Sequence, residues 1–435
     1  MHYAEHYRTV ATHLPGQQLP WLQALRAEAE QTFSTRGFPS QREEEWRYTP
    51  VTPIEKTLFK PTSNAPQVRI DSDLLQRYRL AGAWSLVFID GRYAPHLSRL
   101  EGTPSACRIG SVAATLASDP QRVQALLHQA ARPEQHGFIA FTTAYFQDGA
   151  LIDIPEGVVL EQPIQILHLT TQPEGLSVLR HLINLGPQAQ ASVIETYAGA
   201  QDMAALTASV SELYLAADAS LNHYKLQAEG DKSVHFGGLY ATQERHARLH
   251  QHHAAFGGLL ARTEIHADLG PAAECSLDGL FLASNRRHLD THTLLRHRGA
   301  HAISRESYRG IASDRGRGVF SGRIVVEKDA QKTDAEMNNR NLLLSEDAEI
   351  DSKPQLEIHA DDVKCAHGVT VGQLSPESVF YLQSRGIDET SARNMLTFAF
   401  ANELVEKIRH PGHQQQVRDQ LLAHLPQADI RGEWL

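Results

Sequence analysis

Recurring turns about 28 to 30 residues apart constrain this 435-residue chain more than any other feature. In each turn a small residue follows two positions after another, beyond polar residues, as in "LGPQAQA", "LAADASL", "ERHARL" and "LGPAAECSL". Ala189, Ala219, Ala247 and Cys275 then lie 30, 28 and 28 residues apart. One coil of a parallel β-helix needs a period in this range, because each coil buries its inward side chains against the next. A β-sandwich with regularly spaced turns is the alternative.

Strand patterns fill the chain from about residue 140 to residue 387. In "ALIDIPEGVVLEQPIQILHL", Ile152 and Ile154 share one parity, and so do Ile164 and Ile166, as a half-buried strand requires. We therefore expect a mainly β protein, because no helical period interrupts this stretch. Three regions are predicted: an N-terminal α/β region (1–140), a parallel β-helix core (141–387) and a C-terminal helical domain (388–435).

Helical periods appear only near the two ends of the chain. "WLQALRAEAEQTF" has helical spacing, and "RGFP" ends it. Asp388 is a plausible N-cap of a second helix, in which Leu396, Phe400, Leu404 and Ile408 form an i, i+4 stripe before Pro411-Gly412. A further amphipathic segment follows it. Two readings stay open: this pair of helices caps the β-stack, or it binds a partner.

The composition excludes several classes of protein. With 41 Lys+Arg against 51 Asp+Glu, the chain is mildly acidic, which argues against nucleic acid or an anionic membrane as its main partner. The opening residues show no signal peptide, and no run of about 18 apolar residues occurs, so we expect a cytoplasmic protein. Its three cysteines, Cys107, Cys275 and Cys365, lie far apart, which fits reduced thiols.

The segment "DDVKCAHGVTVG" holds the clearest candidate ligands. On one strand Cys365 and His367 share a face, about 6.6 to 6.8 Å apart along the chain, and could converge on one ion. Two ligands are half of a tetrahedral site, so the others would come from a neighbouring coil, a second subunit or a small molecule. The alternative is structural, because Val363, Val369 and Val371 share the same parity and suggest an inward, apolar face.

Other chemistry finds little support. The histidines of "ERHARLHQHH" could form a labile metal patch, but a solvated face is the preferred interpretation, with His246, His250 and His252 on one side and His253 on the other. The chain has no G-x-x-x-x-G-K-[ST] loop, no G-x-G-x-x-G motif opening a helix and no G-x-S-x-G elbow. Asp361 and Asp362 could line a polysaccharide-cleaving groove, although that class is secreted. Because the chain has no nucleotide-binding loop, any energy from nucleotide hydrolysis must come from a partner.

One long segment, residues 331–392, closely resembles the SufB/SufD family of iron-sulfur cluster assembly proteins, and within it the SufD branch. It reads "QKTDAEMNNRNLLLSEDAEIDSKPQLEIHADDVKCAHGVTVGQLSPESVFYLQSRGIDETSA". "GFPSQREEEWRYT", "LVFIDGRY" and "DGALIDIPEGVVLEQPI" match as well, so the resemblance spans nearly the whole chain in order. "CAHG" stands where SufB carries a different, glutamate-containing segment.

This resemblance implies a right-handed parallel β-helix between an N-terminal helical region and C-terminal helices. It implies a non-catalytic scaffold that pairs with a SufB-type paralogue through the β-helix and with a SufC-type ABC ATPase through the C-terminal helices. A homodimer of the chain alone, in the absence of the paralogue, stays open as an alternative. His367, and less securely Cys365, would help to hold iron or a nascent Fe-S cluster shared with the partner.

The resemblance also bears on the helices and on cofactors. It favours a docking surface on the helix at 388–408, with Phe398, Phe400 and Leu404 as candidate partner contacts. A reduced flavin is associated with the family's complex, but no residue here can be assigned to it, and no nucleotide is expected on this chain. The alternatives are an independent, SufB-like scaffold and a metal-dependent β-helix enzyme.

Overall fold

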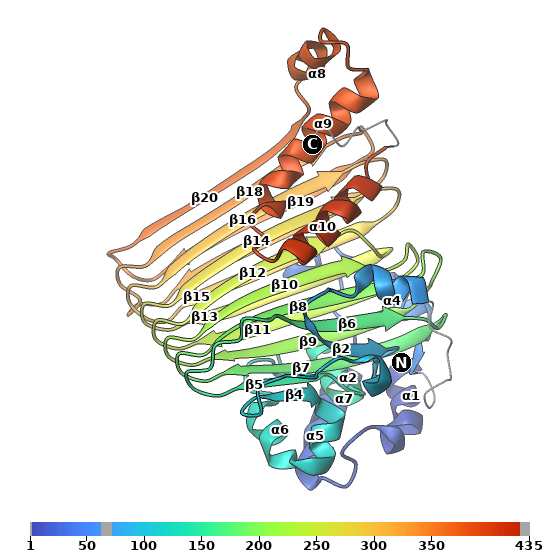
Figure 1. Cartoon of the computed structure of the whole chain (residues 1–435), viewed down its shortest axis with the longest axis vertical. Helices are drawn as coiled ribbons and strands as arrows, with labels where there is room; N and C mark the ends of the chain where they lie inside the picture. Colours follow the sequence, from blue (N-terminus) through green and yellow to red (C-terminus); the bar gives the residue numbers. More distant parts are fainter. Residues whose placement is uncertain (1, 62–71, 427–435) are drawn as a thin grey trace.

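The computed structural model describes residues 2–61 and 72–426 and consists of a β-solenoid with helices at both ends (Figure 1). Two long sheets form the solenoid. In order along the first sheet lie β4 (Arg108–Ser111), β5 (Ala150–Ile154), β7 (Gly175–Leu185), β9 (Leu206–Leu215), β11 (Val234–Gln243), β13 (Leu260–Leu269), β15 (His288–His297), β17 (Arg317–Val326) and β19 (Glu349–Ile358), with β1 (Lys60–Pro61) beside β7.

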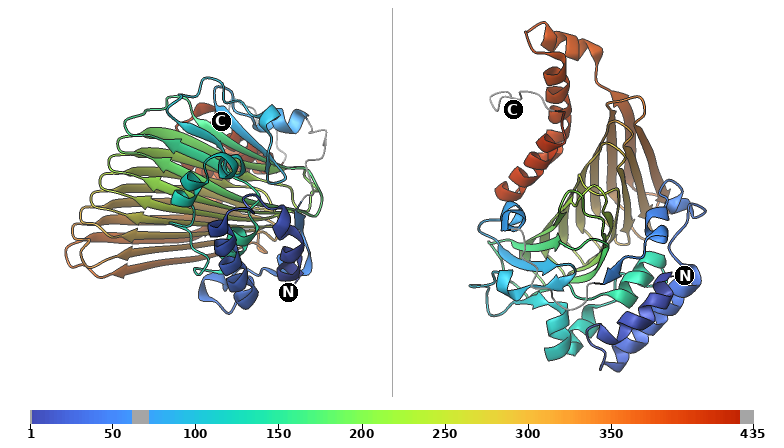
Figure 2. Two further views of the ribbon diagram at one scale, coloured as in Figure 1. Left: turned by 90° about the horizontal axis from the view of Figure 1, so that it is seen from below. Right: turned by 90° about the vertical axis from the view of Figure 1, so that its right-hand side faces the viewer.

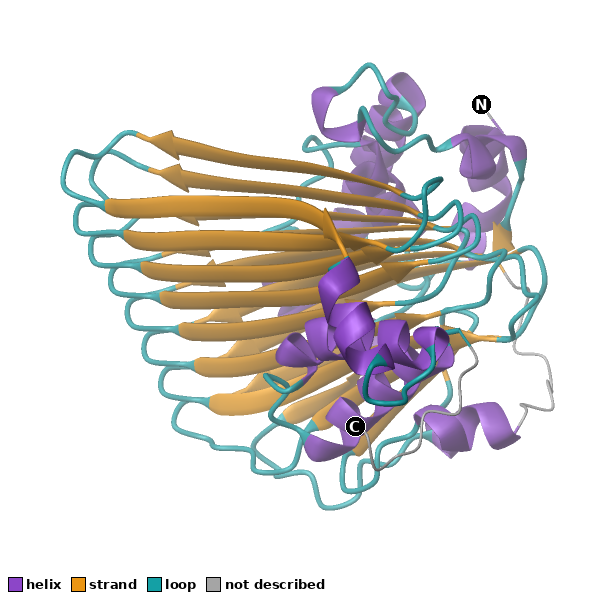
Figure 3. Cartoon of the chain, turned by 90° about the horizontal axis from the view of Figure 1, so that it is seen from above, coloured by secondary structure: helices purple, strands orange, loops and turns teal. Residues whose placement is uncertain are grey.

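The second sheet runs over the first, and the chain passes from one to the other at every turn of the solenoid (Figure 3). It comprises β3 (Arg92–Tyr93), β2 (Trp84–Ile89), β6 (Ile164–Thr170), β8 (Gln190–Gly199), β10 (Ser220–Ala228), β12 (Arg248–Ala255), β14 (Glu274–Ala283), β16 (Ile303–Ala312), β18 (Asp334–Leu343) and β20 (Lys364–Gln373). All pairs are parallel except β2 with β3 and β4 with β5. The predicted parallel β-helix is confirmed and the β-sandwich is excluded.

Stacked turns explain the period seen in the sequence. One residue in each turn has a positive φ, and its N–H donates to a carbonyl of the next turn; these residues are Gln188, Asp218, His246, Ala272, His301 and Lys332. The residue that follows each of them is small and buried: Ala189, Ala219, Ala247, Ala273, Ala302 and Thr333. Cys275 is therefore two positions beyond the true repeat, and its register partners are Leu249 and Ser304 on the neighbouring strands.

Helices cover parts of the outer faces of both sheets (Figure 2). α2 packs along α7, which contacts β7 and β9 of the first sheet. α9 contacts β14 and β16 of the second sheet. The helices are α1 (His2–Val10), α2 (Pro20–Arg36), α3 (Thr52–Lys56), α4 (Ser72–Tyr78), α5 (Val112–Ser118), α6 (Pro120–Leu126), α7 (Gly137–Tyr145), α8 (Pro376–Gln383), α9 (Glu389–Val405) and α10 (Pro411–Ala423), with 3-10 turns at Ala11–His13, Glu44–Trp46 and Pro95–Leu97.

The helical regions differ from the predicted domains at two points. β2 and β3 come from the N-terminal region but extend the second sheet, so this region shares the solenoid's core. The predicted boundary after residue 387 falls between α8 and α9, because α8 already begins at Pro376. Within residues 2–61 and 72–426, no helix combines the length and apolar character that crossing a membrane requires.

Buried ion pairs fasten the N-terminal region to the first sheet. Arg180 of β7 and Glu212 of β9 are both fully buried, with 2.6 Å between Nη2 and Oε1. The Glu212 carboxylate also accepts the backbone N–H groups of His128, Ala130 and Ala131, just before α7. A carboxylate with this many donors is compensated for its burial, so the attachment is a fixed one.

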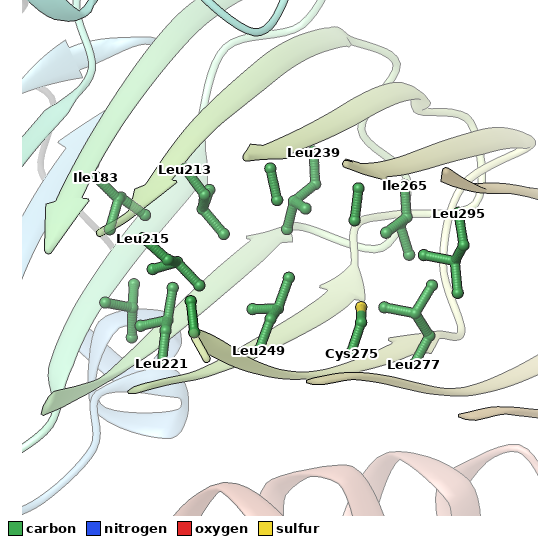
Figure 4. Packing of buried hydrophobic residues seen from close by; sticks show 14 of the residues in the cluster. Ile183, Leu213, Leu215, Leu221, Leu239, Leu249, Ile265, Cys275, Leu277 and Leu295 are labelled. Atoms are coloured by element: carbon green, nitrogen blue, oxygen red, sulfur yellow. The ribbon is translucent and has the colours of Figure 1, made fainter. Parts of the chain in front are cut away.

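The interior of the solenoid has an apolar lane and a polar lane. Figure 4 shows the apolar lane, in which Leu, Ile and Ala side chains from both sheets interdigitate around Leu249 and Ile265. The polar lane lies beside it and holds Glu195, His223 and Lys225, all of which are at most 5% exposed. β8 has ten residues and β10 has nine, and every second one points inward. One strand therefore contributes inward side chains to both lanes.

Candidate functional site

The last coil leaves one end of the solenoid open. β20 pairs with β18 on one side and with no strand of the described chain on the other. The N–H of Lys364 donates to Thr333, so the even residues of β20 point their backbone groups toward β18. Because alternate residues of a strand point to opposite sides, Cys365, His367 and Val369 present theirs at the unpaired edge. Such an edge is a template for a strand of another chain.

β19 forms the second unpaired edge, but its backbone is interrupted. The N–H groups of Glu349 and His359 donate to carbonyls beside β17, so the odd residues of β19 face β17 and the even residues face the edge. Pro354 is one of the edge-facing residues and has no N–H to offer. β20 is therefore the better template for strand addition, while β19 offers a broken ladder.

Cys365 and His367 lie side by side on the inward face of this last coil, as their parity predicted. Their register partners on β18 are Ala335 and Met337, which are both core residues. Cys365 is half-buried and packs against that core, and burial raises the pKa of its thiol. His367 is exposed, because no further coil within the described residues covers it. The thiol is thus the more structural of the two groups, and the imidazole is the one that a second molecule can reach.

The site is incomplete within this chain. Among residues 2–61 and 72–426, no three His, Cys, Asp or Glu side chains are grouped so that they could hold a metal ion. Imidazole and thiolate are both ligands for iron and Fe-S clusters, so the chemistry of the two side chains is compatible with binding either one. Cys365 and His367 could supply only part of a coordination shell, and the rest would come from outside this chain.

Apolar side chains surround the two candidate ligands at the open end. Val371 is 47% exposed and Ile358, at the end of β19, is 41% exposed. Leu356 and Val369 are half-buried beside them. Exposed apolar residues that accompany unpaired strand edges mark an interaction surface rather than a solvated one. We call these two edge strands with their inward side chains the open-end surface.

The C-terminal helices place the predicted partner contacts differently from the sequence prediction. Phe398 and Leu404 are 5% and 1% exposed, and Phe398 belongs to a core between α9 and the second sheet. Phe400 is half-buried, with the guanidinium of Arg309 5.5 Å from its ring centroid. Phe398 and Leu404 therefore fasten α9 to the solenoid and have no side-chain surface to offer a partner.

α8 carries the exposed aromatic residues instead. Phe380 is 71% exposed and Tyr381 57% exposed, the two most exposed large apolar side chains among the described residues. The guanidinium of Arg385 lies 5.1 Å from the Tyr381 ring centroid. Figure 1 shows α8 at the end of the molecule beyond β20, away from the body that α9 covers. Sequence reasoning missed this helix because eight residues are too few to show a period.

The histidine-rich segment is not the solvated face that we expected. His252 and His253 are 0% and 2% exposed. The Nε2 of His252 lies 3.1 Å from the carbonyl oxygen of Leu404 on α9, while His253 points inward and lies 3.3 Å from Thr263 Oγ1. Burial lowers the pKa of His252 to about 4, so its imidazole is neutral. These histidines are structural because α9 covers one side of β12 and the opposite sheet covers the other.

A buried ionic cluster in the polar lane was also missed. Glu195 Oε1 lies 3.0 Å from His223 Nε2, and Glu229 Oε2 lies 2.8 Å from His235 Nδ1. Lys225 Nζ lies 2.9 Å from His235 Nε2. Burial alone would raise the pKa of Glu195, but His223, His181 and Lys225 hold it well below its usual range. Burial lowers the pKa of Lys225 to about 8 despite both carboxylates.

A sequence signal for this cluster exists but points the wrong way. In "LNHYKLQAEG" the polar residues alternate with apolar ones, as they do in a strand with one solvated face. Here Leu226 and Tyr224 face α9 and α10 outside, while His223 and Lys225 face inward. Alternation alone gives two faces and does not say which of them is covered.

Comparisons with known proteins agree over most of the chain. The family model described as "SUF system FeS cluster assembly, SufBD core domain" matches residues 168–400, and the "SufBD protein N-terminal region" model matches residues 1–166. Iron-sulfur cluster assembly protein SufD of Escherichia coli is 34% identical over 90% of each chain. An iron-sulfur cluster assembly SufBD family protein of Synechocystis is 30% identical, covering 88% of this chain and 86% of that protein.

Proposed function

The chain belongs to the SufB/SufD family of iron-sulfur cluster assembly proteins, and from this premise we propose that it is a SufD-type, non-catalytic scaffold. It pairs with a SufB-type paralogue through the open-end surface and with a SufC-type ABC ATPase through its C-terminal helices. Its role in Fe-S cluster assembly follows from the family. The pairing, the ligand and the docking helix are the proposal.

One observation carries the proposal: the candidate ligands lie on an unpaired strand edge. Cys365 and His367 sit on β20, where backbone donors, backbone acceptors and apolar side chains are all left for another chain. A paralogue with the same solenoid end could add its strands there and supply the missing ligands at the same time. The same end could pair two copies of this chain when the paralogue is absent.

His367 is the proposed ligand for iron or the nascent cluster, with Cys365 as a weaker candidate. His367 is exposed at the edge, whereas Cys365 has a raised thiol pKa and is partly covered by the core. A thiol with a raised pKa is a poorer metal ligand at neutral pH, because metals bind the thiolate. Cluster or iron is the cargo of this site, shared with the partner.

α8 is the proposed contact with the ATPase. Its aromatic pair is exposed, and the helix stands clear of the solenoid on a short connection to α9. Exposed Phe and Tyr beside an arginine are typical of the anchor residues of protein interfaces. The sequence has no nucleotide-binding loop of the G-x-x-x-x-G-K-[ST] type, which agrees with ATP being hydrolysed by the partner.

Anaerobic reconstitution of the cluster on the complete complex tests the ligand. His367→Ala should lower the cluster yield severalfold in a complex that still assembles, because a ligand and not a packing group is removed. His359→Ala is the matched control, since His359 is also an exposed histidine near the open end but lies in the turn after β19. An unchanged yield in His367→Ala, or an equal loss in His359→Ala, would remove His367 from the proposal.

Binding of the ATPase tests α8 separately. Phe380→Ser combined with Tyr381→Ser should weaken binding at least about tenfold, as expected for two exposed anchors. Phe400→Leu on α9 is the control, because that side chain packs against Arg309 and the second sheet. Normal ATPase binding by the double variant would place the docking surface elsewhere.

A further inference from the structure

Two buried carboxamides lie directly beneath the open-end surface. Asn339 and Asn341 of β18 are 0% and 3% exposed and point into the solenoid, next to the large apolar side chains of Met337 and Tyr308. An amide in such surroundings destabilises the fold unless its hydrogen bonds are made. Each amide donates to the other: Asn339 Nδ2 lies 3.2 Å from Asn341 Oδ1, and Asn341 Nδ2 lies 2.6 Å from Asn339 Oδ1.

The amide pair also connects both edge strands. Ser352 of β19 donates its hydroxyl to Asn339 Oδ1 over 2.7 Å, which crosses from the first sheet to the second. Asn341 Nδ2 donates to the carbonyl oxygen of Thr370 on β20 over 3.3 Å. We call Asn339, Asn341 and Ser352 the amide bridge. It joins β19 to β20, each of which is otherwise held by a ladder on one side only.

The neighbouring coil leaves room for this arrangement. Gly310, the register partner of Asn341 on β16, faces the amide, and a Cβ there would lie 2.4 Å from Asn341 Oδ1. Any other residue at position 310 would displace the Asn341 amide or the ring of Phe281, which lies 2.3 Å from the same point. The last three coils are thus shaped around the amide bridge.

We propose that the amide bridge positions the two edge strands for the partner. A partner solenoid must meet β19 and β20 at once, so the separation of these two edges decides whether both can be engaged. Hydrogen bonds have a defined length and direction, whereas an apolar core would allow the last, half-covered coil to shift. The bridge residues act through the strands and touch neither cargo nor partner. This inference rests on the proposed pairing through the open-end surface.

Ser352→Ala is the test, because it removes the bond between the sheets and leaves the reciprocal bonds of Asn339 and Asn341 in place. Ser304→Ala is the matched control: Ser304 is 0% exposed and also makes a bond between the sheets, 2.9 Å from His297 Nε2, deeper in the solenoid. Both variants lose one hydroxyl and one bond between the sheets. Ser352 is half-buried and Ser304 fully buried, so Ser304→Ala should lower the free energy of unfolding at least as much as Ser352→Ala.

Two readouts separate the bridge from a merely structural bond. In the chain without partner, hydrogen exchange of Asp351 and Lys353, whose amides face β17, should be about two- to tenfold faster in Ser352→Ala and unchanged in Ser304→Ala. The Kd for the SufB-type paralogue should rise by about the same factor only in Ser352→Ala, because binding must then order the edge strands.

The outcomes are distinguishable. Unchanged exchange in Ser352→Ala would overturn the bridge, and faster exchange with an unchanged Kd would overturn its role in partner binding. An equal change of Kd in Ser304→Ala would do the same. If the wild-type chain does not bind the paralogue at all, the proposed function fails, and the exchange readout still decides whether the bridge holds the edge strands.

Discussion

The two ends of the solenoid interior treat buried polar groups in opposite ways. In the early coils, Glu195 is fully buried but compensated, with Tyr197, Ser211 and His223 all within hydrogen-bond distance of its carboxylate. In the late coils, Glu306 is equally buried and accepts one bond from Thr293, while its Oε1 has no partner among the described residues. Burial raises the pKa of Glu306 to about 8, whereas the pKa of Glu195 is held low.

This difference distinguishes the early coils, whose buried charges are paired, from the late coils, which end on the unpaired edges of β19 and β20. α7, packed against α2, covers β7 and β9 of the early coils, where the buried charges are paired, whereas α9 lies further along on β14 and β16 of the second sheet. The late coils replace ion pairs with neutral groups, namely Glu306, Asn339 and Asn341, and end on bare strand edges. The proposed function places partner recognition at the open end, away from the paired charges of the early coils.

The largest expected effect is a loss of stability from Glu195→Gln. The substitution leaves His223 and Lys225 buried without their nearest carboxylate, and breaking a buried network of this kind lowers the free energy of unfolding by about 3 to 5 kcal/mol. Chemical denaturation at pH 7 measures it. A loss below about 1 kcal/mol would mean that the cluster is solvated in solution, and it would contradict the claim that the early coils bury paired charges.

Glu306→Gln should change the free energy of unfolding in the opposite direction from Glu195→Gln. Burial raises the pKa of Glu306 to about 8 in the folded chain, whereas in the unfolded chain the carboxyl loses its proton near its ordinary pKa of 4.5. Stability therefore falls as pH rises through this window, by about 3 kcal/mol at pH 7. Glu306→Gln removes the titration, so it should stabilise the chain at pH 7 and have little effect near pH 4.5.

Unfolding free energies of wild type and Glu306→Gln at several pH values between 4.5 and 8 give this result directly. Parallel curves for the two proteins would show that Glu306 is solvated or ionised in the folded state. A variant that is less stable at every pH would mean that the lone carboxyl makes bonds that the structure does not contain.

The smallest effect on stability is expected at the open-end surface. Val371→Asp with Ile358→Asp should change the free energy of unfolding by less than about 0.5 kcal/mol, because both side chains are already exposed. The pair should nevertheless abolish binding of the paralogue and any self-association, since charges would be buried in the interface. Sedimentation with and without the paralogue checks it, and binding at wild-type strength would exclude this surface.

The sequence predicted the solenoid because its period is physical. Each coil must turn through a residue with positive φ and then a small buried one, which leaves a repeating mark in the sequence. The sequence pattern assigned the last repeat position to Cys275 instead of Ala273, because the two residues share a parity and either can follow the turn "GPAA". Parity likewise placed Cys365 and His367 on one face.

The sequence could not predict which faces of the strands and helices are covered by other elements of the chain. Local alternation predicted a solvated face for His252, yet α9 from residues far along the chain lies on it. The apolar stripe of Phe400, Leu404 and Ile408 was recognised, but the period of a helix does not reveal which other element covers the stripe. In the same way, nothing local to "KCAHG" shows that β20 is the last strand of its sheet in the part of the chain that the structure describes, which is what leaves His367 exposed.

Hydrogen exchange of β20 with and without the SufB-type paralogue tests the central claim most directly. The amides of Cys365, His367 and Val369 face the unpaired edge, so they should exchange rapidly in the chain alone and become strongly protected in the complex, while the amides of β9 and β11 stay unchanged. Protection that appears only on the outer faces or the N-terminal helices, with β20 still exchanging rapidly, would contradict the account.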